Sequence, residues 1–305
     1  MRIVRTVESF PPDARPSVVA LGVFDGVHLA HRAILDAAVT RAGGATAVAC
    51  TFDPHPADVL QPDRAPLPIT TLDERLALIA ESGIAVTLVL SFTPVLAAME
   101  PEAFVTDILA GGLSAREVVV GFNHRFGRAA RGDARLLREI GARVGVHAEI
   151  VPPLDVDGVP VSSSAIRTAL QRADVAGAAR MLGRPYFVSG GVVEGAGRGR
   201  SLGFATANVA ADRPVLIPAG VYACRFATDT AVHAAVLNAG VRPTFGEKVF
   251  TLEAHVLDFE GNLYGRHVRL DFVAHLRDER KFSSVDALKA QVSEDIAAAR
   301  RVLSA

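Results

Sequence analysis

The sequence predicts a doubly wound α/β domain with a parallel sheet, followed by a small all-β barrel domain that ends in a helix. Three observations lead to this fold class. Apolar strand-like runs alternate with helical patterns through the first half of the chain, short alternating strands follow residue 185, and an amphipathic helix closes the chain. The 305 residues are enough for two domains with cores of their own. We place the boundary near Gly183, which gives domains 1–183 and 184–305.

The first domain takes its predicted elements from the spacing of its apolar residues. Apolar runs predict strands at residues 17–22, 45–52, 84–91, 117–121 and 146–151. Helical spacing predicts helices at residues 28–41, 72–82, 101–110 and 135–144, with one or two short helices over 164–182. In such a sheet, ligands bind at the carboxyl ends of the strands. The unusual residues cluster there, at 24–31, 53–55 and 122–133.

The second domain is typical of an all-β barrel or sandwich, and of these we predict the barrel. Its predicted strands cover residues 186–193, 220–226, 232–237, 250–257 and 268–276, separated by Gly, Pro and Asn turns. Residues 285–303 form the predicted terminal helix.

Composition excludes several classes of protein. The 32 Lys and Arg residues balance 33 Asp and Glu residues, which argues against a nucleic-acid coat. Cys50 and Cys224 match no zinc spacing and are expected to be reduced, buried thiols. We find no signal-peptide core and no apolar run of transmembrane length. We therefore expect a cytoplasmic protein, a monomer or weak homo-oligomer, with neither nucleic acid nor membrane as a partner.

Residues 22–31, GVFDGVHLAH, leave a predicted strand, turn at glycine and enter a helix. A helix N-terminus offers backbone N–H groups and a positive dipole end, which suit a phosphate group. His28 and His31 are three residues apart, so both imidazoles can face the same ligand and stabilise developing charge. The alternative is a zinc site, but this pair lacks the further ligands that zinc requires.

Three other segments have both a functional and a structural interpretation. Glycine-rich residues 190–208 could hold phosphate or simply form a tight hairpin. Glu253 could be a general base or a solvent-facing residue of an alternating strand, and we interpret His255, on the same strand face, as structural. The arginines between 125 and 138 form a solvated surface or else steer anions toward a cleft.

Several motifs together resemble those of bacterial riboflavin kinase/FMN adenylyltransferases, the FAD synthetases of the HxGH nucleotidyltransferase superfamily. Residues 22–31 resemble the motif GxFDGxHxGH, residues 51–56 (TFDPHP) resemble TFxPHP, and residues 162–167 (SSSAIR) resemble SSTxIR. Residues 119–127 with 132–133 resemble the VGx(D/N)FxFG…GD loop. In the second domain, residues 199–208, 238–245 and 252–265 resemble GRxLGFPTAN, NxGxRPTF and VExHLLDF…GDLYG.

The resemblance implies that the chain phosphorylates riboflavin to FMN and adenylylates FMN to FAD, using ATP and Mg²⁺ in both reactions. It implies catalytic roles for His28, His31 and Glu253, the last as the base for the riboflavin 5′-hydroxyl. Thr206 and Asn208 would hold Mg²⁺, for which oxygen ligands are suited. The implied substrate- and nucleotide-binding residues are Gly22, Phe24, Asp25, Gly26, His55, Asn123, Ser163, Ser164, Arg167, Gly197, Arg200, Gly203, Thr206 and Asn208.

The sequence departs from these motifs at four positions. Ala30 and Ala205 replace glycine and proline, His124 replaces phenylalanine, and Asn262 replaces aspartate. A methyl group at Ala30 could hinder close approach of ATP to the backbone, and losing proline at 205 should loosen the turn before Thr206. Two alternatives therefore stay open: a riboflavin kinase with impaired adenylyltransfer, and a non-catalytic flavin- or nucleotide-binding paralogue.

Overall fold

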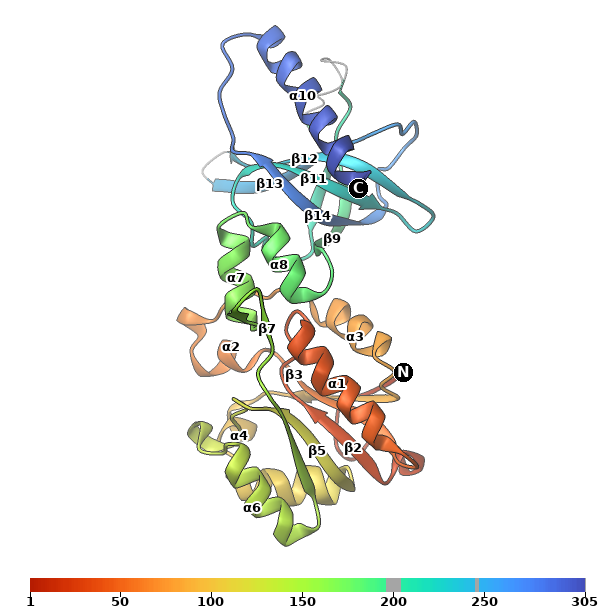
Figure 1. Cartoon of the computed structure of the whole chain (residues 1–305), viewed down its shortest axis with the longest axis vertical. Helices are drawn as coiled ribbons and strands as arrows, with labels where there is room; N and C mark the ends of the chain where they lie inside the picture. Colours follow the sequence, from red (N-terminus) through yellow and green to blue (C-terminus); the bar gives the residue numbers. More distant parts are fainter. Residues whose placement is uncertain (196–203, 245–246, 305) are drawn as a thin grey trace. The chain divides into compact units, whose positions relative to one another are not determined.

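The computed structural model describes residues 1–195, 204–244 and 247–304, which form two compact units, Met1–Ser163 and Ser164–Ala305 (Figure 1). Each unit has the predicted fold class. The helices over 164–182 belong to the second compact unit. The boundary at residue 183 between the two predicted activities stays a prediction.

The first unit contains a six-stranded parallel sheet in the order β1-β4-β3-β2-β5-β6. The predicted strands appear as β2 (Ser17–Leu21), β3 (Thr46–Asp53), β4 (Val86–Ser91), β5 (Ala115–Gly121) and β6 (His147–Val151). The chain builds outward from β2 through β3 to β4, and then returns to the other side of β2 with β5. The strand order therefore reverses beside β2, which is where a doubly wound sheet binds its ligand.

The sheet strands lack the alternating pattern of a half-exposed sheet. All five residues of β2 are buried, as are the first five of β4. Continuous burial indicates that both faces of the sheet are covered, as in other parallel α/β sheets. Phe104, Leu109 and Leu137 pack against the strands in one continuous core.

The helices of this unit largely follow the predicted pattern. Three lie where the spacing placed them: α1 (Leu29–Ala42), α3 (Leu72–Glu81) and α6 (Ala134–Val144). The predicted helix 101–110 differs, because α5 (Pro101–Ala103) continues as a π-helix, η3 (Phe104–Gly112). At its end the Leu113 N–H donates to the Ile108 carbonyl, five residues back, at 2.9 Å.

The sequence pattern missed the short elements of this unit. Edge strand β1 (Arg2–Val4) pairs with β4, but three residues are too few to form a recognisable pattern. The others are η1 (Pro12–Ala14), α2 (Pro56–Leu60), η2 (Pro62–Arg64), α4 (Pro94–Ala97), η4 (Arg128–Ala130), β7 (Asp155–Val156) and β8 (Val159–Pro160).

The second unit begins with two helices and then closes a six-stranded barrel. α7 (Ser163–Gln171) and α8 (Val175–Leu182) lie within the predicted helical region. The barrel order is β10-β13-β12-β11-β14-β9. Its strands are β9 (Tyr186–Val193), β10 (Ala207–Ala211), β11 (Gly220–Ala227), β12 (Val232–Thr244), β13 (Glu247–Val256) and β14 (His267–Arg277). Of these, only β10 was not predicted.

Alternate residues of the barrel strands fill its interior. Tyr222, Leu237, Ala254, Leu270 and Phe272 have no exposed surface. Helix α10 (Val285–Leu303), drawn in blue in Figure 1, packs on the outer face instead. There it contacts Val221, Ala223 and Val236 through Ala299 and Ile296. The outer face therefore has a second apolar layer, formed between the barrel and the helix.

Two properties of the described residues concern the membrane and the redox state of the cysteines. No helix in the described ranges is long and apolar enough to cross a membrane. Cys50 and Cys224 are free and buried, as predicted. Burial raises the pKa of Cys50 to about 12 and that of Cys224 in the same direction, so both are neutral thiols.

Candidate functional sites

The N-terminus of α1 brings the two predicted histidines together. His28 is the N-cap residue, and its Nδ1 accepts a hydrogen bond from the His31 backbone N–H at 3.2 Å. The two rings stack with centroids 3.5 Å apart and planes 14° from parallel. Because Nδ1 of His28 accepts, the proton of its neutral ring lies on Nε2. The pair is therefore fixed in position, with a defined donor atom on His28.

The loop before α1 has a tightly constrained backbone. Phe24, Gly26 and Val27 have φ values of 55°, 83° and 37°, in the left-handed region that non-glycine residues rarely adopt. A Cβ atom at Gly26 would lie 3.0 Å from the Ile69 side chain. The buried Phe24 ring meets His31 edge-on, with centroids 5.4 Å apart. Phe24 thus supports His31 from within the protein.

Asp25 acts on the same loop through an internal network. Its carboxylate accepts hydrogen bonds from the backbone N–H groups of Ile69 and Thr70 at 3.0 and 3.1 Å, and from the Thr70 hydroxyl at 3.2 Å. The Thr70 hydroxyl in turn accepts from the Gly26 N–H at 3.1 Å. Asp25 is 3% exposed, so these contacts indicate an anchor for the loop. Sequence spacing could not reveal Thr70, because it is 45 residues away from Asp25.

A buried arginine that sequence reasoning missed ties this loop to the end of β3. The Arg75 guanidinium donates to the carbonyls of Val23 and Phe52 at 2.8 and 3.0 Å. Burial lowers the pKa of Arg75 from its usual value, although nearby Asp25 and Asp53 act in the opposite direction. In the sequence it looks like any arginine on an amphipathic helix.

The remaining predicted residues of this unit lie on neighbouring loops. His55 is the N-cap of α2, just beyond β3, and its Nδ1 accepts from the Ala57 N–H at 3.0 Å. Asn123 is exposed and follows β5. Gly22 is half-buried, and a Cβ there would lie 3.0 Å from the Phe24 ring. The carboxyl ends of β2, β3 and β5 therefore carry the predicted residues at one edge of the sheet.

The serine motif divides between the compact units. The Ser163 hydroxyl donates to the Asp25 backbone carbonyl at 3.0 Å, within the first unit. Ser164 and Arg167 lie on α7 and belong to the second unit. The observed contact of Ser163 holds the same loop that carries Asp25 and Gly26.

Two sequence departures in this unit have a clear structural setting. Ala30 is the second residue of α1 and has ordinary helical geometry. The His124 ring stacks on Phe126 with centroids 5.9 Å apart, and burial of the ring lowers its pKa to about 4. His124 is therefore neutral near pH 7 and packs as an aromatic residue, as the expected phenylalanine would.

Four of the arginines between 125 and 138 form surface ion pairs. Arg128 and Arg131 both pair with Glu100, Arg125 lies 3.8 Å from Asp133, and Arg135 lies 3.7 Å from Glu139. Their side chains are 57–84% exposed. These pairs favour the interpretation of a solvated surface over that of an anion-steering patch.

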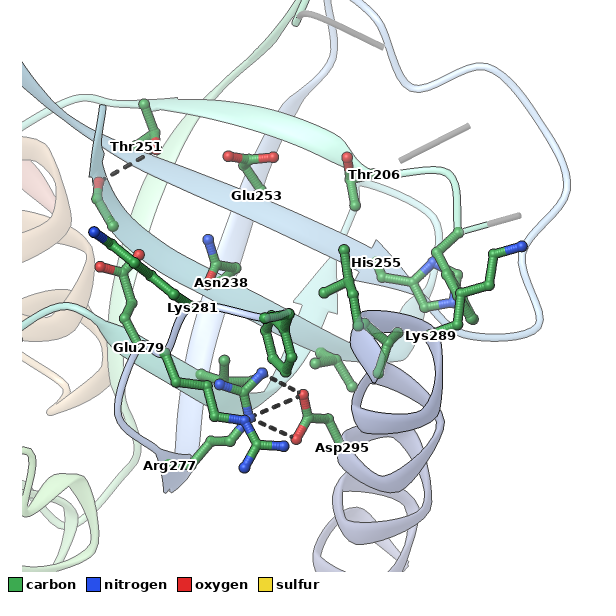
Figure 2. A pocket seen from close by; sticks show the side chains of 18 of the residues that line it. Thr206, Asn238, Thr251, Glu253, His255, Arg277, Glu279, Lys281, Lys289 and Asp295 are labelled. Carbon is green, nitrogen blue, oxygen red and sulfur yellow. Dashed lines mark hydrogen bonds and ion pairs between the residues drawn. The ribbon is translucent and has the colours of Figure 1, made fainter. Parts of the chain in front are cut away.

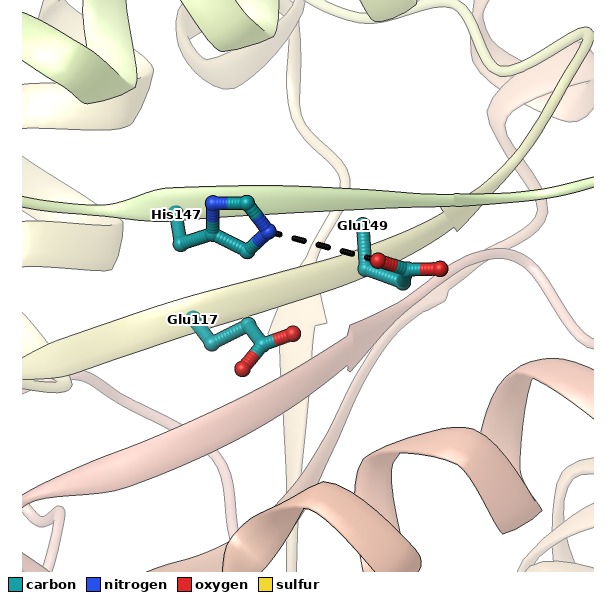
Figure 3. A group of neighbouring side chains, drawn as sticks. All are labelled: Glu117, His147 and Glu149. Atoms are coloured by element: carbon teal, nitrogen blue, oxygen red, sulfur yellow. Dashed lines mark ion pairs between the residues drawn. The ribbon is translucent and has the colours of Figure 1, made fainter.

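A second surface group, Glu117, His147 and Glu149, has its potential ligand atoms within 4.8 Å of one another (Figure 3). Arg41 already pairs with both carboxylates: its Nε contacts Glu117, and its Nη2 lies 3.4 Å from Glu149. The guanidinium offsets part of this negative charge, so we interpret the group as an ion-pair network on β5 and β6.

The barrel unit brings three polar side chains into one row. In the antiparallel ladders, Glu253 of β13 pairs with Asn208 of β10 on one side and with Asn238 of β12 on the other. Directly paired residues share a sheet face. Because the neighbouring Leu252 and Ala254 fill the barrel interior, this row lies on its outer face. Sequence reasoning selected Glu253 and Asn208 but gave no role to Asn238.

A pocket of about 730 Å³ lies between this outer face and α10 (Figure 2). Thr206, Asn238, Thr251 and Glu253 line one part of it. Another part is apolar and is lined by Val221, Val236, Phe282, Leu288 and Val292. The pocket therefore offers a broad apolar surface beside a compact group of hydrogen-bonding side chains, a combination typical of small-molecule sites.

A smaller pocket of about 320 Å³ adjoins the same strand segment. Its walls include Val192, Phe259, Leu263 and Tyr264. Thr206 lines both pockets. The two cavities could thus hold two ligands whose reacting groups meet near Thr206.

The first part of the glycine-rich segment approaches Asn208 closely. A Cβ atom at Gly195 would lie 2.0 Å from Nδ2 of Asn208, so only glycine allows this approach. The predicted phosphate-binding residues Gly197, Arg200 and Gly203 lie outside the described residues.

A buried ion pair that sequence reasoning missed fastens α10 beside the larger pocket. Arg277 donates from Nε to Oδ1 of Asp295 at 3.0 Å and from Nη2 to Oδ2 at 2.8 Å. Gln291 adds a hydrogen bond to Oδ1 at 2.9 Å. Figure 2 shows the pair below the pocket, linking the end of β14 to the helix.

The α/β unit carries paired imidazoles at a helix N-terminus, and the barrel carries a carboxylate at a pocket. These features indicate a two-domain enzyme of the group-transfer class. Residues 10–165 match the family model for FAD synthetase, and residues 182–303 match that for riboflavin kinase. The chain belongs to the family of bifunctional riboflavin kinase/FMN adenylyltransferases.

Relatives of that name resemble the chain over nearly its whole length. The protein of Bacillus subtilis is 36% identical, covering 94% of this chain and 93% of the relative. That of Pseudomonas fluorescens is 37% identical, covering 98% and 97%. A crystal structure described as a macrolide-efflux protein from Streptococcus pneumoniae superposes with a TM-score of 0.89 at 29% identity, covering 98% of each chain.

Proposed function

We propose that this chain phosphorylates riboflavin to FMN in its barrel unit and transfers the adenylyl group of ATP to FMN in its α/β unit. Both family models match, and the full-length relatives carry both activities in their names. This combination supports the bifunctional enzyme over a kinase with impaired adenylyltransfer and over a non-catalytic flavin- or nucleotide-binding protein.

The observation that carries the kinase assignment is the row of Asn208, Glu253 and Asn238 beside Thr206. Glu253 accepts the proton of the riboflavin 5′-hydroxyl as that oxygen attacks the γ-phosphorus of ATP. A new oxygen–phosphorus bond forms, the bond from the γ-phosphorus to the bridging oxygen breaks, and ADP leaves. Asn238 and Asn208, on either side of Glu253, orient the reacting groups by hydrogen bonding.

The residues around Glu253 fit a magnesium ion. Thr206 and Asn208 offer a hydroxyl and an amide oxygen, which are hard oxygen ligands of the kind that Mg²⁺ prefers. When bound with ATP, the ion would neutralise phosphate charge. Gly195 leaves room for the Asn208 amide, because a Cβ atom at that position would overlap it.

The two barrel pockets suit the two kinase substrates. The larger pocket, with its apolar wall under α10, suits the flavin ring system. The smaller pocket, lined by Leu263 and Tyr264, suits the adenine of ATP. The shared position of Thr206 then lies where the phosphates and the ribityl hydroxyl would meet.

For adenylyltransfer we assign His28 and His31 to the ATP phosphates. A phosphate oxygen of FMN attacks the α-phosphorus of ATP, and pyrophosphate leaves. In its neutral form the His28 ring carries its hydrogen on Nε2, because Nδ1 accepts from the His31 backbone N–H, and the N-terminal dipole of α1 adds attraction for a phosphate group. We assign Asp25, Phe24 and Ser163 to holding the loop, and His55 and Asn123 to nucleotide and flavin binding. Nucleotide-binding roles for Ser164 and Arg167 stay predictions of the sequence.

One incubation tests the proposal. The purified chain is mixed with riboflavin and Mg-ATP, and the flavins are separated by chromatography. Formation of FMN followed by FAD is the expected result. FMN alone would favour the kinase with impaired adenylyltransfer, and tight flavin binding without conversion would favour the non-catalytic protein.

Three further expectations belong with the proposal. The cytoplasm is where we expect the protein, in keeping with two free buried thiols. We expect small-molecule substrates only, with neither nucleic acid nor membrane as a partner. A monomer or weak homo-oligomer is the expected state.

A further inference from the structure

We infer that His255 is a positioning residue for the kinase site: it holds the segment 204–206 through the Ala205 carbonyl and so fixes Thr206 at the pocket. The inference rests on the proposed function of the barrel unit. It also differs from the interpretation of His255 as a merely structural residue of an alternating strand.

The contact defines which ring nitrogen carries the hydrogen. Nδ1 of His255 lies 2.8 Å from the carbonyl oxygen of Ala205. A carbonyl oxygen can only accept, so Nδ1 must donate. Phe204 braces the same ring edge-on, with centroids 5.7 Å apart and planes 89° from parallel. His255 thus contacts both residues that precede Thr206.

The hydrogen bond lies where the barrel ladder stops. The pairing of β10 with β13 begins at Ala207 opposite Ala254, so residues 204–206 precede the ladder. His255 is the next residue of β13 after Ala254. Its side chain bonds to Ala205, two residues before the first ladder pair, and so links β13 to the segment that precedes β10. The bond therefore restrains Thr206 from its N-terminal side, while the ladder restrains it from the other.

The residue at position 205 makes this restraint more important. Proline there would fix φ near −65° by its ring, whereas alanine leaves φ free. With Ala205, the side chain of His255 supplies a restraint that the covalent structure does not. Loss of the bond should then misplace Thr206, whose hydroxyl lines the same pocket as Glu253.

Paired substitutions separate the two ring nitrogens. An asparagine amide nitrogen falls near the position of Nδ1, and a glutamine amide nitrogen falls near that of Nε2. We expect His255→Asn to keep most of the kinase activity. His255→Gln and His255→Ala should lower kcat/KM for Mg-ATP about three- to tenfold, the loss typical of one neutral hydrogen bond. The KM for riboflavin should change less than that for Mg-ATP.

A second-site change tests the role of position 205. Ala205→Pro should restore much of the loss in His255→Gln while changing the unsubstituted chain less, because proline replaces the lost restraint. Calorimetric binding of Mg-ADP supplies a readout independent of turnover. There His255→Gln should weaken binding, and Ala205→Pro should recover it.

Controls distinguish this inference from loss of folding and from failure of the proposed function. His267→Gln is a matched change on β14, where the ring pairs with Asp212 at 2.7 Å, and it should leave Mg-ADP binding unchanged. FAD formation from supplied FMN should persist in every variant. If the unsubstituted chain forms no FMN, the proposed function fails. If it forms FMN but His255→Asn and His255→Gln lose equal activity, or if Ala205→Pro gives no recovery, the positioning role is wrong.

Discussion

Replacing Asp295 by asparagine should loosen α10 and open the flavin pocket. The carboxylate receives two parallel hydrogen bonds from Arg277, at 3.0 and 2.8 Å, and one from Gln291 at 2.9 Å. The Asp295 side chain is 5% exposed and that of Arg277 is 19% exposed. The substitution keeps the shape of the side chain but removes its charge and leaves the guanidinium partly buried without a counter-charge.

The expected loss of stability follows from this burial. Breaking a fully buried ion pair from one side typically costs about 3–5 kcal/mol. Because Arg277 retains some contact with water, we expect about 2–3 kcal/mol for Asp295→Asn, at or below the lower end of that range. Leu288, Lys289 and Val292 of α10 line the pocket, so a helix that undocks more often should raise the KM for riboflavin.

Hydrogen exchange of residues 285–303, together with urea unfolding, measures the effect. Asp258→Asn is the matched control, because Asp258 pairs with Arg300 of the same helix at 2.7 Å but is 72% exposed. It should change exchange little, since exposed ion pairs contribute little. Arg277→Met combined with Asp295→Leu should recover much of the stability. Equal exchange in Asp295→Asn and Asp258→Asn would mean that the buried ion pair does not hold α10 on the barrel.

Three other predictions concern the α/β unit. His28→Ala should lower the rate of FAD formation from FMN about a hundredfold, because it removes a hydrogen-bond donor to the phosphates. It should also cost about 1 kcal/mol of stability through the lost N-cap. A rate within twofold of that of the unsubstituted chain would contradict the role of His28. Ala30→Gly should change the rate of FAD formation from FMN less than about threefold, because Ala30 already has ordinary helical geometry and glycine removes only a methyl group. A tenfold gain in that rate would mean that the methyl group hinders ATP binding. Burial lowers the pKa of His124 from 6.5 to about 4, so between these pH values the unfolded chain binds more protons at this residue than the folded chain does. The contribution of the neutral His124 ring to stability is therefore complete above pH 6.5 and is lost as the pH falls toward 4. His124→Phe should flatten the dependence of the melting temperature on pH over that range, and an unchanged slope would show that other groups cause it.

Local patterns were sufficient for the fold class of both units. The continuous apolar runs of β2 and β4 predict a sheet covered on both faces, and Figure 1 shows helices around it. Among the missed strands, β1 has three residues and β7 and β8 have two each, and such short runs carry little periodic signal. β10 has the sequence ANVAA, whose small side chains give little apolar contrast. The position of β1 beside β4 depends on contacts between distant parts of the chain, which no local pattern contains.

For the candidate sites too, local patterns identified some residues, whereas others are brought in only by contacts between distant parts of the chain. The pattern at the start of the helix selected His28 and His31, the family resemblance implied the role of Glu253, and local geometry places the histidines in contact. Asn238 joins Glu253 only through the pairing of β12 with β13. A nucleotide-binding role for Asp25 stays a prediction, and the contacts of its carboxylate with Ile69 and Thr70 join distant parts of the chain. Sequence reasoning therefore finds the reactive groups more readily than the groups that hold them.

We propose that one chain carries two separate flavin-transforming sites, and a mixture of two variants, each impaired at one site, shows whether this is so. Glu253→Gln should form no FMN from riboflavin but should convert supplied FMN to FAD. His28→Ala combined with His31→Ala should form FMN but little FAD. Neither protein alone should make FAD from riboflavin and Mg-ATP, whereas their mixture should. A mixture that makes no FAD, or a Glu253→Gln protein that cannot use supplied FMN, would contradict the assignment.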